Sequence, residues 1–148
     1  MTSLSIEISA SIEQVWDYVS NIESHTSWMA DARSIISTSE KQNDVDATYI
    51  CDTKLGPLST LDRMRVLRYE PPFILEIEHV GSVTGSGEFR LERIGNQQTK
   101  FVWEERLRFP WHMGARVGKF VGMLLLHRIW KRNLIALKAQ IESMKWEK

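Results

Sequence analysis

Three polar side chains fall on strand faces that are otherwise apolar, and their types could support acid–base chemistry. Alternation of apolar and polar residues places His79, Asp62 and Glu105 on the inward faces of three separate predicted strands. An imidazole changes charge near neutral pH, and a neighbouring carboxylate stabilises that charge or fixes the tautomer. We therefore expect His79 and Asp62 to serve as an acid–base pair or as polar ligand anchors, with Glu105 as a third candidate. A structural pair without chemistry is the alternative.

The turns between these strands predict which residues face each other. A hairpin turning at Gly56-Pro57 places Cys51 opposite Asp62, and a second turning at Glu70-Pro71 places Asp62 opposite His79. A slip of one residue would move every side chain to the other face of the sheet. The acid–base pair therefore depends on this register.

Metal and thiol chemistry find little support in the sequence. Cys51 is the one cysteine, which excludes an internal disulfide and fits a reducing cytoplasm, and it is expected to pack as a small hydrophobe. Without a second thiol or a dense histidine cluster we predict no metal site. The chain has no P-loop, dinucleotide fingerprint or Ser-His-Asp signature, so we predict no cofactor.

The elements that must position these residues follow from periodicity. Residues 4–8 alternate as a strand, and Ser11 with Gln14 forms a capping box before a helix with helically spaced apolar residues. A short helix or turn is predicted around 25–30. Period-two segments separated by Pro and Gly turns fill 33–110, and a helix of about thirty residues follows. Its apolar face is predicted to contain Leu126, Ile129, Trp130, Leu134, Leu137, Ile141 and Met144.

This order predicts an α+β fold of one domain over residues 1–148, with an antiparallel sheet covered on one face by helices. A curved sheet that wraps around a long helix leaves a hollow in which small ligands bind. The residues predicted to line this hollow share inward or helix-facing positions. They are Trp28, Tyr49, Cys51, Met64, Ile77, Phe89, Phe101, Trp103, Gly118, Gly122 and Leu126.

The first half of the long helix carries glycines at 114, 118 and 122, each of which costs helix stability of roughly 0.5 to 1 kcal/mol relative to alanine. One hypothesis is that residues 113–126 form a bendable gate to the hollow, and close packing without gating is the alternative. Val117, Val121 and Leu124 fall on the side of the helix that carries Arg128, Lys131 and Glu142 in its second half. Such an apolar patch beside basic residues would suit a homodimer contact, a protein partner or a membrane surface.

Composition excludes few classes of protein. The 148 residues are 43% hydrophobic and 26% charged with a formal net charge of zero, as in ordinary globular proteins. The segment 111–148 is basic, but the chain lacks a nucleic-acid reader motif and we predict no nucleic-acid binding. No secretory signal is recognised, and the apolar run 117–126 is far shorter than the about 20 residues that span a membrane. We therefore expect a cytoplasmic protein.

Three stretches carry a resemblance to a known family: ISASIEQVWDYVSNIESHTSW, RVLRYEPPFILEIE and the closing LIALKAQIE. Together they resemble the START-like (SRPBCC) superfamily with the Bet v 1 helix-grip fold, and within it the bacterial polyketide cyclase/dehydrase and lipid-transport branch. The resemblance implies a seven-stranded antiparallel sheet wrapped around the C-terminal helix, with two short helices after the first strand. It carries no invariant catalytic motif.

Three functions remain open at this point. The first is binding of a hydrophobic small molecule, lipid or polyketide-like, in the hollow. The second is a cyclase or dehydrase of the aromatase type that uses His79 and Asp62 as acid and base. The third is a protein or membrane interaction module that uses the outer face of the C-terminal helix.

Overall fold

The computed structural model describes the backbone of residues 2–55, 58–81, 83–108 and 116–144, and their side chains apart from 55, 58 and 116–123. The elements follow the predicted order of one strand, two short helices, six strands and one long helix. In chain order they are β1 (Thr2–Ile8), α1 (Ile12–Val19), the 3₁₀ helix η1 (Ile22–Ser27), β2 (Ala32–Ser37), β3 (Thr48–Leu55), β4 (Leu58–Glu70), β5 (Ile74–Val80), β6 (Thr84–Gly95), β7 (Gln98–Arg108) and α2 (Arg116–Ser143).

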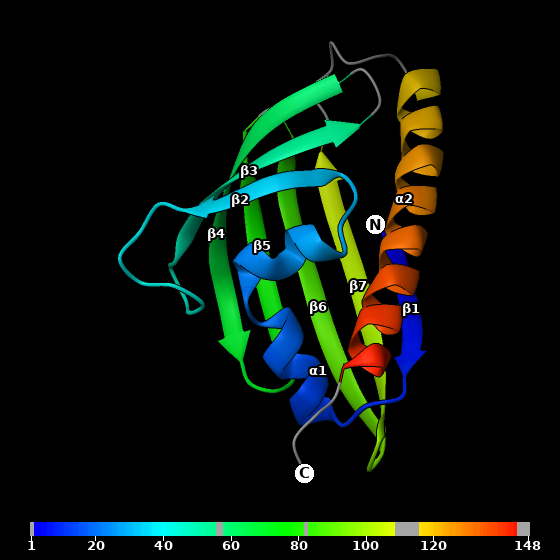
Figure 1. Ribbon diagram of the computed structural model, residues 1–148. Helices are drawn as coiled ribbons and strands as arrows, with labels where there is room; N and C mark the ends of the chain where they lie inside the picture. Colours follow the sequence, from blue (N-terminus) through cyan, green and yellow to red (C-terminus); the bar gives the residue numbers. More distant parts are fainter. Residues whose placement is uncertain (1, 56–57, 82, 109–115, 145–148) are drawn as a thin grey trace.

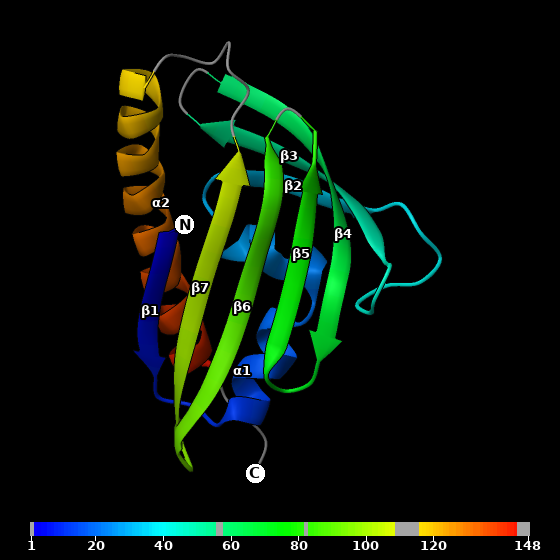
Figure 2. The same ribbon diagram turned by 180° about the vertical axis from the view of Figure 1, so that it is seen from behind.

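All seven strands form one antiparallel sheet in the order β1-β7-β6-β5-β4-β3-β2. Strands β2 to β7 follow one another in sequence and in space. Strand β1 pairs with β7 and forms the other edge of the sheet. The sheet curves around α1 and η1, and α2 runs alongside β1 and β7 (Figure 1). Seen from behind, the strands stand in front of α1 and η1, and α2 lies at the side of the sheet next to β1 (Figure 2). This arrangement confirms the predicted α+β helix-grip fold.

Helix α1 begins and packs as its sequence predicts. The Ser11 hydroxyl accepts a hydrogen bond from the Gln14 amide at 3.2 Å, and the Gln14 side chain accepts one from the Ser11 amide at 3.0 Å. This capping box satisfies two backbone donors that the first turn leaves free. The apolar face formed by Ile12, Val15, Trp16 and Val19 is buried against the sheet.

Helix α2 presents a nearly continuous apolar face to the sheet. Leu126, Trp130, Leu134, Leu137 and Ile141 are buried as predicted, and Ile129 is partly buried. Met144 was predicted on this face but is 42% exposed, because the helix ends at Ser143. No helix within the described ranges is both long enough and apolar enough to cross a membrane.

A buried polar residue, Asn133, interrupts the apolar face of α2. Its Oδ1 accepts a hydrogen bond from the Ala30 amide at 3.0 Å, and its Nδ2 donates to the Asp31 carboxylate at 2.8 Å. Only 1% of Asn133 is exposed, so these two bonds lie inside the molecule. They join α2 to the segment between η1 and β2 and fix the helix over the sheet.

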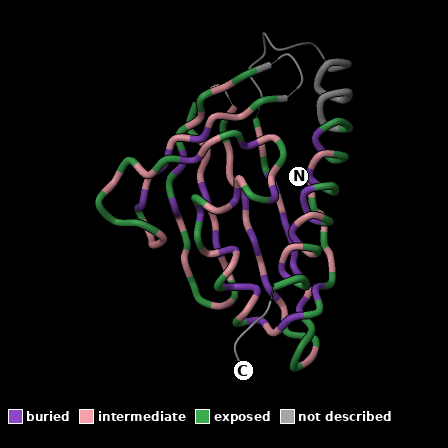
Figure 3. The backbone as a smooth tube through the Cα atoms, in the orientation of Figure 1, coloured by how far each residue is buried: buried purple, intermediate pink, exposed green. Residues whose placement is uncertain are grey.

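The two faces of the sheet differ as strand alternation requires. Along most strands buried residues alternate with partly or fully exposed ones (Figure 3). One exception is Val102 on β7, which is 4% exposed although it lies between the inward Phe101 and Trp103. Phe73 continues the alternation of the buried Leu75 and Ile77, but it is 49% exposed because it lies in the turn before β5 begins at Ile74.

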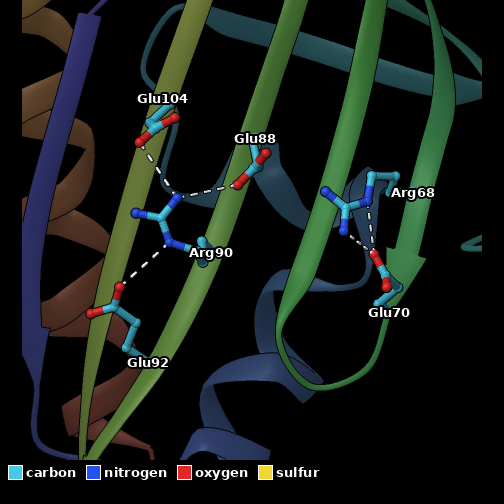
Figure 4. Close-up of polar contacts among 6 residues, drawn as sticks. All are labelled: Arg68, Glu70, Glu88, Arg90, Glu92 and Glu104. Carbon is cyan, nitrogen blue, oxygen red and sulfur yellow. Dashed lines mark hydrogen bonds and ion pairs between the residues drawn. The ribbon is translucent and has the colours of Figure 1, made fainter.

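The outward face of the sheet carries several ion pairs. Arg90 on β6 lies 3.4 Å from the carboxylates of Glu88, Glu92 and Glu104, and Arg68 pairs with Glu70 on β4 (Figure 4). Exposed pairs of this kind contribute roughly 0 to 1 kcal/mol each. The outward face therefore adds solubility more than stability.

The predicted register is right for one hairpin and wrong for the next. Cys51 lies opposite Asp62 as expected, but His79 lies opposite Met64 and not opposite Asp62. The β4–β5 connection is longer than assumed, since Glu70 pairs with Ile74, and a bulge leaves Leu67 without a partner. The two effects combine to a shift of two residues, which keeps His79 on the inward face.

The hypotheses about the glycine-rich half of α2 concern residues whose side chains are mostly outside the described part of the structure. Gly114 lies outside the described residues, and at 117, 118, 121 and 122 only the helical backbone is described. The gate and the apolar contact through Val117 and Val121 therefore stay predictions. Leu124, the third residue of that patch, is 54% exposed.

Candidate ligand-binding cavity

A cavity of about 170 Å³ lies between the inward face of the sheet, η1 and α2. Its volume is close to the roughly 150 Å³ of an engineered cavity that holds benzene, and below the about 300 to 1,000 Å³ of drug-sized sites. Most of its wall is apolar, with Met64, Ile77, Phe89 and Trp130 contributing from β4, β5, β6 and α2. It can enclose a small ring system or the end of a longer molecule.

The polar end of the cavity consists of Thr60, Asp62, His79 and Glu105, which come from β4, β5 and β7. Glu105 is 8% exposed, and its Oε1 accepts a hydrogen bond from the indole Nε1 of Trp103 at 2.8 Å. Its Oε2 lies 3.6 Å from Nε2 of His79. This distance is longer than a hydrogen bond but close enough for an ion pair.

Glu105 reaches His79 across strand β6 because β6 carries a glycine at that point. Gly87 lies opposite Glu105 on one side and opposite Ile77 on the other. A Cβ atom at Gly87 would lie 2.5 Å from Oε1 of Glu105 and 2.8 Å from its carboxyl carbon. The carboxylate therefore occupies the space that a side chain at 87 would need.

The pKa of His79 reflects this neighbourhood. Burial penalises the imidazolium form and by itself lowers the pKa, but the carboxylates of Glu105 and, further away, Asp62 outweigh it. The pKa of His79 is therefore raised above its ordinary value. His79 keeps its proton to higher pH than a free histidine does.

Asp62 completes the polar end without touching His79 through a hydrogen bond. Its Oδ2 accepts a hydrogen bond from the Thr60 hydroxyl at 2.9 Å. Its Oδ1 is buried and finds no donor among the described residues, and the same is true of Oε2 of Glu105. Buried polar groups are normally hydrogen-bonded, so two acceptor oxygens without a hydrogen bond in one cavity require an explanation.

A second histidine, His25 in η1, also lines the cavity and was missed by the sequence analysis. Its Nε2 donates to the Val19 carbonyl at 2.7 Å, and its ring packs 5.4 Å from those of Trp28 and Phe89. Burial lowers the pKa of His25 to about 4, although the hydrogen bond to Val19 opposes that shift. His25 is therefore neutral at physiological pH. A single histidine within a short helical segment carries no periodic signal that could have identified it.

Cys51 lines the cavity but is poorly suited to act as a nucleophile. Burial raises the pKa of its thiol, although its hydrogen bond with Thr53 opposes that shift, and the nearby carboxylates of Asp31, Asp62 and Asp52 raise the pKa further. The thiolate is therefore disfavoured. Packing as a small hydrophobe, as the sequence suggested, agrees with this setting.

The predicted wall residues separate into two groups. Cys51, Met64, Ile77, Phe89, Trp103 and Leu126 line the cavity. Trp28, Tyr49 and Phe101 do not: Trp28 and Phe101 lie in an aromatic cluster with Phe89, and the Tyr49 hydroxyl accepts a hydrogen bond from the Asn43 amide outside the cavity. Alternation places a residue on the correct face but does not say how deep it lies. The side-chain environment of Gly118 and Gly122 lies outside the described residues.

The cavity can orient a small molecule and exchange a proton at one end. Among the described residues no three His, Cys, Asp or Glu side chains are arranged to hold a metal ion. What the polar end offers is an imidazole paired with a carboxylate, next to a second carboxylate. Such a group can accept or donate a proton within an apolar enclosure.

Comparison with known proteins gives a consistent result. A family model described as polyketide cyclase / dehydrase and lipid transport matches residues 2–145. No curated protein matches the chain.

Several solved structures share the fold. They include the Zhui aromatase/cyclase from Streptomyces sp. R1128, with 12% identity over 95% of this chain and 92% of that chain and a TM-score of 0.77. A START superfamily protein from Mycobacterium smegmatis matches with 15% identity over 97% and 98% of the two chains and a TM-score of 0.74. The di-domain ARO/CYC StfQ from the steffimycin biosynthetic pathway matches over 96% of this chain but 44% of its own length, with 12% identity and a TM-score of 0.72. At such identities these likenesses show the fold alone.

Proposed function

The chain belongs to the polyketide cyclase / dehydrase and lipid transport family, and on that premise we propose that it binds a small hydrophobic molecule in the cavity between the sheet and α2. The observation that carries this proposal is a largely apolar cavity wall with Asp62, His79 and Glu105 at one end. Burial of an apolar ligand there contributes roughly 25 cal/mol for each Å² removed from water, and the polar end fixes its orientation.

The cavity volume limits what fits. About 170 Å³ accommodates one small ring system, so a larger lipid or polyketide would place only one end inside the described cavity. Phe89, Trp103 and Trp130 present aromatic rings to this space. Flat ring systems are therefore better suited to it than branched chains.

A cavity-filling variant tests this proposal. Ala32 lines the cavity, and Ala32→Phe should fill part of it, whereas Ala139→Phe makes the same change on the exposed side of α2. We expect native mass spectrometry of the protein purified from cells, together with naphthalene titrations, to show ligand in wild type and in Ala139→Phe but not in Ala32→Phe. Equal naphthalene binding by both variants, or none by the folded wild type, would contradict the proposal.

A second candidate function is catalysis of ring closure, and the pair formed by His79 and Glu105 favours it. In an intramolecular aldol reaction, the molecules in which the imidazole of His79 is neutral would use it to remove a proton next to one carbonyl. The resulting enolate carbon would attack the second carbonyl, and the imidazolium would return the proton to the new alkoxide. Glu105 would stabilise the imidazolium between these steps. Asp62, which was predicted as the partner of His79, would act from a greater distance.

This candidate can be tested with a substrate that fits the cavity. Heptane-2,6-dione closes by aldol addition and loses water to give 3-methylcyclohex-2-enone, which is detected by its ultraviolet absorbance. We expect the protein to accelerate this reaction above the buffer rate, and His79→Ala but not His127→Ala to remove the acceleration, since His127 is exposed on α2. A wild-type rate equal to that of buffer, with naphthalene still bound, would leave binding as the function.

A further inference from the structure

The polar end of the cavity is rich in acceptors and poor in donors. Oε2 of Glu105 and Oδ1 of Asp62 are buried and have no hydrogen-bond donor among the described residues. Glu105 is more than nine-tenths buried, so water does not reach it freely. A bound molecule that donates a hydrogen bond would satisfy an oxygen that has no hydrogen bond within the protein.

The charges around the cavity also disfavour a ligand that carries a negative charge. Three carboxylates line it, those of Asp31, Asp62 and Glu105, and no lysine or arginine is among the described lining residues. Of the two histidines that line it, His25 donates Nε2–H to the Val19 carbonyl and is neutral at physiological pH. His79 is the remaining lining residue that can carry a positive charge, and the ion pair with Glu105 neutralises that charge. An anionic ligand group would therefore meet net negative charge inside a low-dielectric enclosure.

We propose that this cavity selects apolar ring systems that carry a hydroxyl or amine donor at one end, that it rejects carboxylates, and that Glu105 is the residue that determines this selectivity. The inference rests on the proposed function, because it assigns the chemical class of the ligand bound in that same cavity. Fatty acids and aromatic acids are thus disfavoured, whereas phenols, alcohols and aromatic amines are favoured.

The selectivity depends on where Glu105 is held. Trp103 fixes one oxygen of the carboxylate through its indole N–H, and the missing side chain of Gly87 leaves room for the rest. The second oxygen is then directed toward His79 and the cavity. Gly87 is therefore a positioning residue for Glu105.

Three probes of similar size test the proposal: naphthalene, 2-naphthol and 2-naphthoate, each titrated into the full chain and followed by tryptophan fluorescence. Trp103 and Trp130 line the cavity and should report binding. We expect 2-naphthol to bind at least about tenfold more tightly than naphthalene, and 2-naphthoate at least about tenfold more weakly. Equal affinities for 2-naphthol and naphthalene, or 2-naphthoate binding as tightly as 2-naphthol, would overturn the selectivity. Failure of all three probes to bind would instead contradict the proposed binding function.

A matched pair of variants assigns the selectivity to Glu105. Glu105→Gln removes the inward charge, and Glu104→Gln removes the neighbouring charge that faces Arg90 on the outer side. We expect Glu105→Gln to bring the affinities of 2-naphthol and of 2-naphthoate, each relative to that of naphthalene, closer to one. Glu104→Gln should leave both ratios as in wild type. Equal changes in the two variants would overturn the role of Glu105. Should Glu105→Gln fail to fold, the wild-type ratios still decide the selectivity, and Gly87→Ala against Gly95→Ala tests the position of Glu105.

Discussion

The carboxylate of Glu105 lies in the space that a side chain at Gly87 would occupy, and this relationship links strands β5, β6 and β7 at the polar end of the cavity. A single methyl group at 87 would lie 2.5 Å from the carboxylate. The arrangement of Trp103, Glu105 and His79 therefore depends on a residue that itself makes no polar side-chain contact.

The first prediction concerns this glycine. Gly87→Ala should destabilise the protein by about 1 to 3 kcal/mol, because the added methyl group overpacks a buried site and displaces Glu105. Urea unfolding measures this change. Gly95→Ala is the control, since its nearest contact would be Gln98 Cβ at 3.6 Å, an ordinary van der Waals distance. A loss of stability in Gly95→Ala equal to that in Gly87→Ala would contradict this explanation.

The second prediction concerns the protonation of His79. Glu105→Gln should lower the pKa of His79, because burial then acts against the imidazolium with only the more distant Asp62 to oppose it. The chemical shift of the His79 ring protons, followed by NMR against pH, measures this pKa. Glu104→Gln should leave it unchanged.

The raised pKa of His79 also determines how stability changes with pH. The stabilisation of the folded protein by protonated His79 is fully present below the unfolded pKa of about 6.5. It is lost as pH rises through the pKa of His79 in the folded protein. The stability advantage of wild type over Glu105→Gln should therefore be larger near about pH 6 than near about pH 9. An advantage that grows with pH would show that the pair contributes little.

The third prediction concerns His25, for which stability depends on pH in the opposite direction. Its folded pKa of about 4 lies below its unfolded value of 6.5, so the unfolded chain binds the proton first. Stability should fall by up to about 3 kcal/mol as pH drops from about 7 to about 4. Unfolding of His25→Gln should show a weaker dependence over this range. The exposed His127→Gln variant should follow wild type, and a parallel decline in His25→Gln would rule out the proposed cause.

The fourth prediction concerns Asn133. Asn133→Ala removes the acceptor of the Ala30 amide and the donor to Asp31, which should cost about 1 to 3 kcal/mol. Arg132→Ala, next to it on the exposed side of α2, should change the free energy of unfolding by less than about 0.5 kcal/mol. Because Asp31 also lines the cavity, Asn133→Ala should weaken naphthalene binding as well. Intact binding together with lost stability would restrict Asn133 to a structural role.

Much of the fold could be read from local patterns in the chain. Ser11 and Gln14 predict the start of α1, and the apolar spacing after them predicts which side of that helix is buried. Alternation along β3 and β4 predicts that Cys51 and Asp62 share the inward face, and their pairing follows from the short connection between the two strands. These features depend on residues close together in sequence, where spacing and geometry are directly related.

The sequence by itself therefore determined the element order, the helix-grip fold and the inward direction of Asp62, His79 and Glu105. The tertiary structure decided which of them meet. A longer turn and the bulge at Leu67 moved His79 two places away from Asp62, and the missing side chain of Gly87 let Glu105 reach it from two strands away. The physical reason is that alternation reports a direction for each side chain, whereas contact across strands depends on bulges, turn lengths and the space left by neighbouring residues.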